Sequence, residues 1–128
     1  MKDKLLKLLE NSYSPYSNFR VAAIVVTNDE KEFCGVNVEN ASFSSTICAE
    51  KSAIVSAISN GYKKYDFKTL YLMVDSEKIS TCCFSCRQVI VEFFSEDSHI
   101  ICMNKHGERQ DFLVKELCNN PFNEEDLK

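Results

Sequence analysis

The chain has 128 residues, 45% of them hydrophobic, and a formal net charge of -4, so we expect one domain with a single core that spans residues 1–128. No apolar run approaches the roughly 18 to 20 residues of a membrane-spanning helix, and the N-terminus lacks a signal-peptide core. An acidic balance with no basic block argues against a nucleic-acid partner, so we expect a cytoplasmic protein, with no membrane partner, that acts on a small neutral molecule.

The first third of the chain predicts a helix followed by two strands. Residues 2–13 place four leucines on one broad apolar face, which is typical of an amphipathic helix: Leu5, Leu6, Leu8 and Leu9. Residues 20–26 and 33–38 are rich in β-forming side chains, and the charged residues between them indicate a hairpin turn.

The rest of the chain alternates between helical and strand periods. A helix is expected from near Cys48 to a stop at Asn60 and Gly61. The further expected elements are a strand at 67–74, a helix at 86–94, strands at 99–104 and 107–112, and a short helix at 112–118. Because helices separate the later strands, we expect crossover connections and a partly parallel sheet in a three-layer α/β domain.

Three of the seven cysteines lie close together, at Cys82, Cys83 and Cys86. An odd count and close spacing in a reducing compartment favour a metal or redox site over a disulfide. Cys48 and the Cys83/Cys86 pair are expected at the starts of two helices, where the helix dipole favours the thiolate that zinc requires. Three protein ligands leave one tetrahedral position open, which is typical of a catalytic zinc.

Each of these residues also has a simpler interpretation. A free cysteine is most often a buried core residue, which is what we expect of Cys34, Cys102 and Cys118. The CxxC spacing also fits a thioredoxin-like redox pair. Glu50, two residues after Cys48, can shuttle protons beside a metal, but a lone glutamate in a first helical turn more often complements the helix dipole.

The segments "NVENASFSSTICAEKSAI" and "CCFSCRQVI" together resemble the cytidine deaminase family, specifically the small free-nucleoside enzymes with a three-cysteine zinc site. The resemblance runs from "SPYSNFRVAA" to "NPFNEEDL". It implies a three-layer α/β/α fold around a mixed five-stranded sheet. It also implies one zinc per chain held by Cys48, Cys83 and Cys86, with Glu50 as the proton carrier.

The activity that the resemblance implies is hydrolysis of cytidine and 2'-deoxycytidine to uridine and 2'-deoxyuridine with release of ammonia, in pyrimidine salvage. Asn37 and Glu39 would bind the ribose hydroxyls and Phe19 would flank the base. Ala41 would address the pyrimidine edge and the Thr81 carbonyl the amino group. The family also implies a homotetramer with shared active sites, in which Phe122 reaches into a neighbouring subunit's site.

Some positions depart from the family pattern. Cys82 stands where the family has proline, which favours Cys83 rather than Cys82 as the ligand. Lys51 replaces an arginine that is thought to offset the charge of the thiolates, so Lys51 and Arg87 are expected to share that role. Ala22 and Phe43 replace a glycine and a tyrosine of the family.

Two alternatives stay open. A deaminase of the blasticidin type, which acts on a nucleoside analogue, shares the zinc site but lacks the ribose-binding pair seen here as Asn37 and Glu39. A non-catalytic zinc or redox module would need a fourth ligand, for which His99 and His106 are the only histidines, or a reversible Cys83–Cys86 disulfide.

Overall fold

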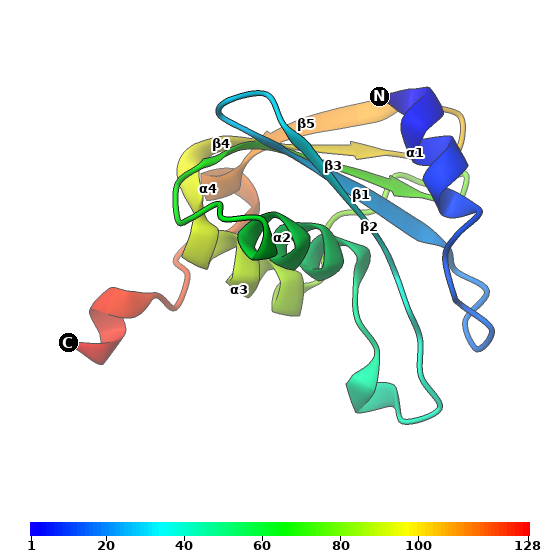
Figure 1. Cartoon of the computed structure of the whole chain (residues 1–128), viewed down its shortest axis with the longest axis horizontal. Helices are drawn as coiled ribbons and strands as arrows, with labels where there is room; N and C mark the ends of the chain where they lie inside the picture. The colour runs from blue at the N-terminus through cyan, green and yellow to red at the C-terminus, as the bar shows by residue number, and fades with distance from the viewer.

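The computed structural model describes residues 1–128 as a five-stranded sheet between two layers of helices (Figure 1). Helix α1 (Lys2–Leu9) lies on one face, and helices α2 (Ala49–Ser59), α3 (Phe84–Phe93) and α4 (Val114–Leu117) lie on the other. The strands are β1 (Val21–Thr27), β2 (Glu32–Val36), β3 (Phe67–Val74), β4 (Phe94–Met103) and β5 (Arg109–Leu113). The expected three-layer α/β architecture is confirmed. None of the helices combines the length and apolar composition that a membrane span requires.

The sheet is mixed, with the strand order β2-β1-β3-β4-β5. Strand β1 runs antiparallel to both β2 and β3, β3 and β4 are parallel, and β5 returns antiparallel to β4. Strands β2, β3 and β4 therefore point the same way, and helices α2 and α3 both start beyond the carboxyl ends of strands at one edge of the sheet. This is the edge at which open α/β sheets build their binding sites.

Helices on both faces explain the near-continuous apolar runs of the central strands. The larger core lies between the sheet and α2, α3 and α4, and the smaller one lies under α1. On α1, Leu5 and Leu9 are fully buried while Leu6 and Leu8 are only partly covered. The predicted apolar face of the first helix is thus observed, with two of its four leucines at the centre of the contact.

Several predicted bounds are wrong at the ends of elements. Helix α1 stops at Leu9 because Tyr13 pairs with the segment after β2, donating to the Asn37 carbonyl over 3.0 Å and accepting from Glu39 N–H over 2.8 Å. Strand β4 starts at Phe94, well before the predicted residue 99. The polar segment 95–98 resembles a loop in sequence, yet it continues the strand past an irregularity in the β3–β4 pairing.

Helix α2 lies unusually close to β2. Its sheet-facing residues Ala49, Ala53 and Ala57 are fully buried and small. A Cβ atom at Gly35 would sit 2.4 Å from both the Ala49 carbonyl oxygen and the Ala53 nitrogen. Gly35 therefore lets the helix backbone rest directly on the strand, and this contact sets where the N-terminus of α2 lies.

We predict that Gly35→Ala destabilises the fold by about 3 kcal/mol, the upper end for overpacking, because the clash is with helix backbone that cannot rotate away. Urea denaturation gives the free energy of unfolding directly. Gly61→Ala is the matched control, since Gly61 has φ +97 but open space around it, and it should cost about 1 kcal/mol. Equal losses in the two variants would contradict the proposed close contact.

Candidate metal centre and substrate cavity

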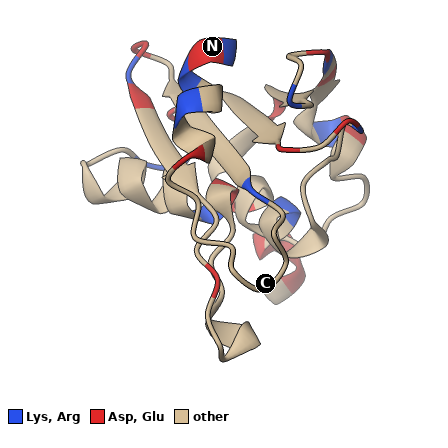
Figure 2. Cartoon of the chain, turned by 90° about the vertical axis from the view of Figure 1, so that its right-hand side faces the viewer, with Lys and Arg blue, Asp and Glu red and all other residues tan.

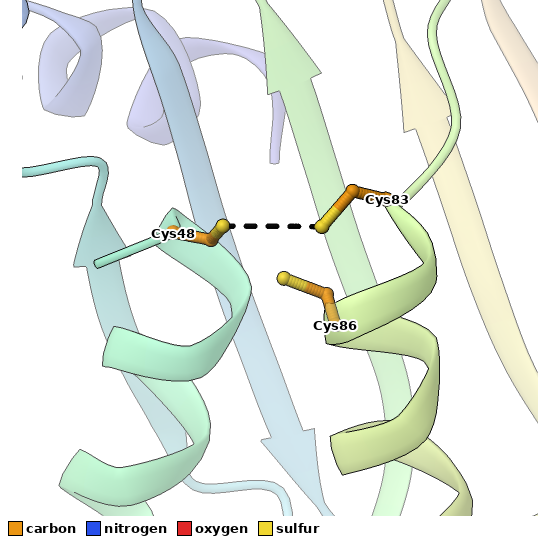
Figure 3. A group of neighbouring side chains, drawn as sticks. All are labelled: Cys48, Cys83 and Cys86. Carbon is orange, nitrogen blue, oxygen red and sulfur yellow. Dashed lines mark hydrogen bonds between the residues drawn. The ribbon is translucent and has the colours of Figure 1, made fainter. Parts of the chain in front are cut away.

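The N-termini of α2 and α3 bring three thiols together (Figure 3). Cys48 is the N-cap of α2, Cys83 is the N-cap of α3, and Cys86 lies in the first turn of α3. Their sulfur atoms all lie within 4.8 Å of one another, and those of Cys48 and Cys83 are 4.0 Å apart. Three sulfurs bound to one tetrahedral zinc at ~2.3 Å lie about 3.8 Å apart, so the spacing fits that ion.

The pKa values of these thiols are also consistent with a cation between them. Hydrogen bonds from the Cys86 and Cys83 thiols, helped by the nearby Lys51 charge, lower the pKa of Cys48 to about 6. The same hydrogen bond, together with burial, raises the pKa of Cys86. Without a cation one thiolate is therefore stabilised at the expense of its neighbour, whereas a divalent ion allows all three to ionise. The donor set suits zinc and leaves a fourth position free of protein ligands.

Cys82 takes no part in the cluster. Its side chain is buried, and its thiol donates a hydrogen bond to the Glu50 carboxylate. The metal-ligand group consists of Cys48, Cys83 and Cys86, which is the register favoured by the resemblance. The sequence suggested only that Cys82 fills a proline position; its contact with Glu50 required the structure.

Glu50 lies in the first turn of α2 and is only 5% exposed. Burial is the main reason that its pKa is raised above 4.5, and the charge of Cys48 adds to the effect. Its own backbone N–H and the thiols of Cys82 and Cys86 hydrogen-bond the carboxylate and oppose the rise. A buried carboxyl whose pKa is moved towards neutrality, beside a metal-ligand cluster, is typical of a general acid and base.

A cavity of about 210 Å³ opens beside this cluster at the carboxyl-end edge of β2 and β3. Cys48, Glu50 and Cys83 line one part of it. The other lining residues are Phe19, Val21, Asn37, Thr46, Ala49, Leu72, Val74, Ser80 and Thr81. The structure therefore brings the predicted residues Phe19, Asn37 and Thr81 to the same cavity as the candidate metal ligands.

Asn37 and Glu39 are held firmly from the loop before β1. The Asn37 side chain donates to the Phe19 carbonyl over 2.8 Å and accepts from the Val21 N–H over 3.0 Å. The Glu39 carboxylate accepts from the N–H groups of Tyr16 and Ser17 over 2.9 and 3.1 Å and from the Ser17 hydroxyl. Glu39 lines a second hollow that borders Thr46, a residue of the main cavity wall.

The two cations expected to offset thiolate charge are placed differently. The Lys51 ammonium donates to the Ser85 hydroxyl over 2.6 Å, which links α2 to α3 next to the thiols. The Arg87 guanidinium instead donates to the carbonyls of Cys82 and Leu117 over 2.8 and 2.7 Å and to the Thr81 hydroxyl over 2.9 Å. Arg87 thus clamps the turn before the ligand pair onto the C-terminal segment.

Two predicted substrate-binding residues lie outside this chain's own cavity. Ala41 is exposed on the segment between β2 and α2 that projects from the body of the molecule (Figure 1). Phe122 is 58% exposed and lies in a separate groove with Phe84 and Arg87, where its carbonyl accepts from the Gln88 side chain over 2.8 Å. Neither residue lines this chain's own cavity, so their contact with a substrate stays a prediction, which for Phe122 concerns a neighbouring subunit's site.

Sequence reasoning missed several residues of the site. Thr46 and Ser80 line the cavity, and Ser17 binds the Glu39 carboxylate. Thr46 lies in "NVENASFSSTICAEKSAI" and Ser17 in "SPYSNFRVAA", so both positions fall within the family resemblance. Their roles were not predicted, because a hydroxyl in a turn most often serves only its own backbone.

The comparisons with known proteins agree with this site. Residues 1–103 match the family model described as the cytidine and deoxycytidylate deaminase zinc-binding region. The cytidine deaminase of Mycoplasma genitalium is 35% identical over 93% of this chain and 90% of its own length, and that of Sporosarcina psychrophila is 36% identical over 94% and 88%. The crystal structure of the cytidine deaminase from Burkholderia pseudomallei superposes with a TM-score of 0.87 at 33% identity, covering 95% of this chain and 99% of that one.

We predict that Cys82→Pro retains zinc while Cys83→Ala loses it. Cys82 N–H makes no backbone hydrogen bond, so a proline there removes none, whereas Cys83→Ala deletes a ligand. Metal analysis of the purified variants should give about one zinc per chain for Cys82→Pro, as for the unmodified protein, and well below that for Cys83→Ala. The reverse result would move the ligand register by one residue.

Proposed function

The chain belongs to the cytidine and deoxycytidylate deaminase family, and we propose that within it Cys48, Cys83 and Cys86 hold one zinc ion and Glu50 moves the protons. Its activity is the zinc-dependent hydrolysis of cytidine to uridine and ammonia. The observation that carries the assignment of residues is a cluster of three thiols, two of which line one cavity together with the buried Glu50 carboxyl. We extend the proposed substrate to 2'-deoxycytidine and the role to pyrimidine salvage.

Zinc, when bound, acts as a Lewis acid that lowers the pKa of water from about 15.7 towards neutrality and so supplies a nucleophile. Glu50 takes the proton from the attacking water and delivers it to N3 of the base. Glu50 then moves the second proton of that water from the new C4 hydroxyl to the departing amine. The hydroxyl becomes the carbonyl of uridine, and the amine leaves as ammonia rather than as a much poorer anionic leaving group. Burial raises the pKa of Glu50, which brings its protonated form closer in energy to the carboxylate and so favours a group that both accepts and returns a proton.

The cavity walls orient the nucleoside for this exchange. Val21, Leu72 and Val74 form apolar walls that exclude water around the ring, and Phe19 flanks the base. The Thr81 carbonyl accepts from the amino group to be removed. At the other end, Asn37 and Glu39 bind the ribose hydroxyls, each of which both donates and accepts.

A free nucleoside fits this site better than the alternative substrates. Positions of Lys and Arg alternate with positions of Asp and Glu along the ribbon in the view of Figure 2, and a formal net charge of -4 disfavours binding to a polynucleotide backbone. The Asn37 and Glu39 pair suits a ribose, in contrast to the blasticidin-type enzymes that lack it. The seven free thiols are in keeping with our proposal that the chain works in the reducing cytoplasm.

We further propose a homotetramer with shared active sites. Phe122 lies outside the cavity of its own chain and its side chain is largely exposed, so it can contribute to a neighbour's site. Ala41 and the 76% exposed Phe43 lie on the projecting segment between β2 and α2, which is placed to reach another subunit (Figure 1). Ala41 would then address the pyrimidine of a neighbour's substrate.

Glu50→Gln tests the chemistry. Wild-type protein incubated with cytidine should lose absorbance as uridine forms, whereas Glu50→Gln should lower kcat by at least about 10³-fold, because the amide cannot accept the proton. Zinc content should stay unchanged, which separates loss of chemistry from loss of metal. Wild-type protein that leaves cytidine intact, or a variant that turns over equally fast, would overturn the proposal.

The same substitution should stabilise the fold at neutral pH. The pKa of folded Glu50 lies above its unfolded value of 4.5, so its contribution to stability is complete below that value and is lost as pH rises through the folded pKa. Glu50→Gln removes the buried charge, and its free energy of unfolding should exceed that of wild type at pH 7. Urea denaturation as a function of pH should show the difference vanishing on acidification below about pH 4.5.

A mixing experiment tests the shared site. Phe122→Ala should lower kcat/KM by about tenfold or more if its ring covers the substrate. When Phe122→Ala and Glu50→Gln chains are co-expressed in equal amounts, about a quarter of the sites in randomly mixed tetramers combine an intact Glu50 with an intact Phe122 from a neighbour. Activity should therefore exceed that of either variant alone. No recovery in mixed tetramers would show that Phe122 acts within its own chain.

A further inference from the structure

The hydroxyl of Ser17 lies between two parts of the nucleoside site. It donates to the second oxygen of the Glu39 carboxylate and accepts from the Phe19 N–H over 3.0 Å. Glu39 and Ser17 are far apart in sequence, so this contact exists only because the loop before β1 folds against the segment after β2. One side chain thus touches both the sugar-binding carboxylate and the backbone of the residue that flanks the base.

Phe19 is held from both ends by this arrangement. Its N–H is fixed by Ser17, and its carbonyl accepts from the Asn37 side chain over 2.8 Å. Between Ser17 and Phe19 the chain reverses at Asn18, whose φ of 56 is left-handed. Phe19, Asn37 and Glu39 are therefore connected through hydrogen bonds, and Ser17 is the residue of this network that contacts Glu39 directly.

The Glu39 carboxylate is also oriented by this turn. Three donors from Tyr16 and Ser17 occupy three of its roughly four lone-pair sites. These donors favour the ionised form and lower the pKa of Glu39, the Ser17 hydroxyl most of all. Glu39 is only half-buried, so the remaining lone-pair site of its carboxylate is open to solvent. That site can accept from a sugar hydroxyl without reorganisation of the carboxylate.

We propose that Ser17 is a positioning residue that sets affinity for the sugar hydroxyls by holding the Glu39 carboxylate in place against the turn at residues 16–17. This inference rests on the proposed function and adds to it a residue that need not contact the substrate. The alternative is a purely structural role, in which Ser17 only completes a turn, since its contact with the Phe19 N–H alone is an ordinary Ser turn. The two interpretations differ in whether the effect of replacing Ser17 depends on the hydroxyl groups of the sugar.

Steady-state kinetics on two substrates separate these readings. Cytidine carries both ribose hydroxyls, and 2',3'-dideoxycytidine carries neither. In Ser17→Ala, KM for cytidine should rise about tenfold, as expected for one hydrogen bond to a charged group, with kcat nearly unchanged. For 2',3'-dideoxycytidine, kcat/KM should change by less than about twofold, because Glu39 has no partner on that substrate.

Ser17→Thr is the matched control, since it keeps the hydroxyl on an exposed side chain, and it should restore KM for cytidine. The inference would be overturned by equal losses on both substrates, by a loss in kcat alone, or by failure of Ser17→Thr to restore KM. In each case turnover of cytidine by the wild-type protein would leave the proposed function standing. Wild-type protein that deaminates neither substrate would overturn both. Zinc content measured in parallel should be the same in all three proteins.

Discussion

The direction of the strands is the constraint on which the site depends. Because β2, β3 and β4 point the same way, α2 and α3 both begin at the same edge of the sheet. Two positive helix ends therefore meet at the cavity, and each offers thiols from its N-cap or first turn. An antiparallel arrangement of these strands would place one helix start at the opposite edge, and the three sulfurs could not share a metal.

Close packing fixes the positions of the starts of α2 and α3 and of the thiols that they carry. Gly35 allows the α2 backbone to lie on β2, which fixes Cys48 and Glu50, while Arg87 fixes the turn that leads to Cys83 through two backbone carbonyls. Proline would stiffen that turn covalently in the family pattern, whereas here a guanidinium clamp holds it from outside. The charge of Arg87 is thus used on carbonyls, and Lys51 is the cation whose charge favours the Cys48 thiolate.

The sequence predicts the features that depend on neighbouring residues and does not predict those that depend on contacts between distant residues. Strand β3 was predicted at its observed bounds because a strand covered on both faces is a continuous apolar run. The start of β4 was missed because residues 95–98 are polar and carry no such pattern. The pattern of the sequence places Cys48, Glu50, Cys83 and Cys86 at two helix starts, but the family resemblance rather than spacing alone assigns their roles. The partners of Arg87 and Ser17 lie as far as 30 and 22 residues away, so only the fold could reveal them.

The two carboxylates of the site illustrate opposite uses of burial. Glu50 is buried with its charge opposed by its surroundings, which costs stability at neutral pH but moves its pKa towards the range in which protons are exchanged. Glu39 remains half-buried among donors that favour its charge, which keeps it ionised as a fixed acceptor. Proton transfer needs a group whose two protonation states are close in energy, and sugar recognition needs one whose state never changes. Exchanging these environments would leave the same residues unable to perform either proposed role.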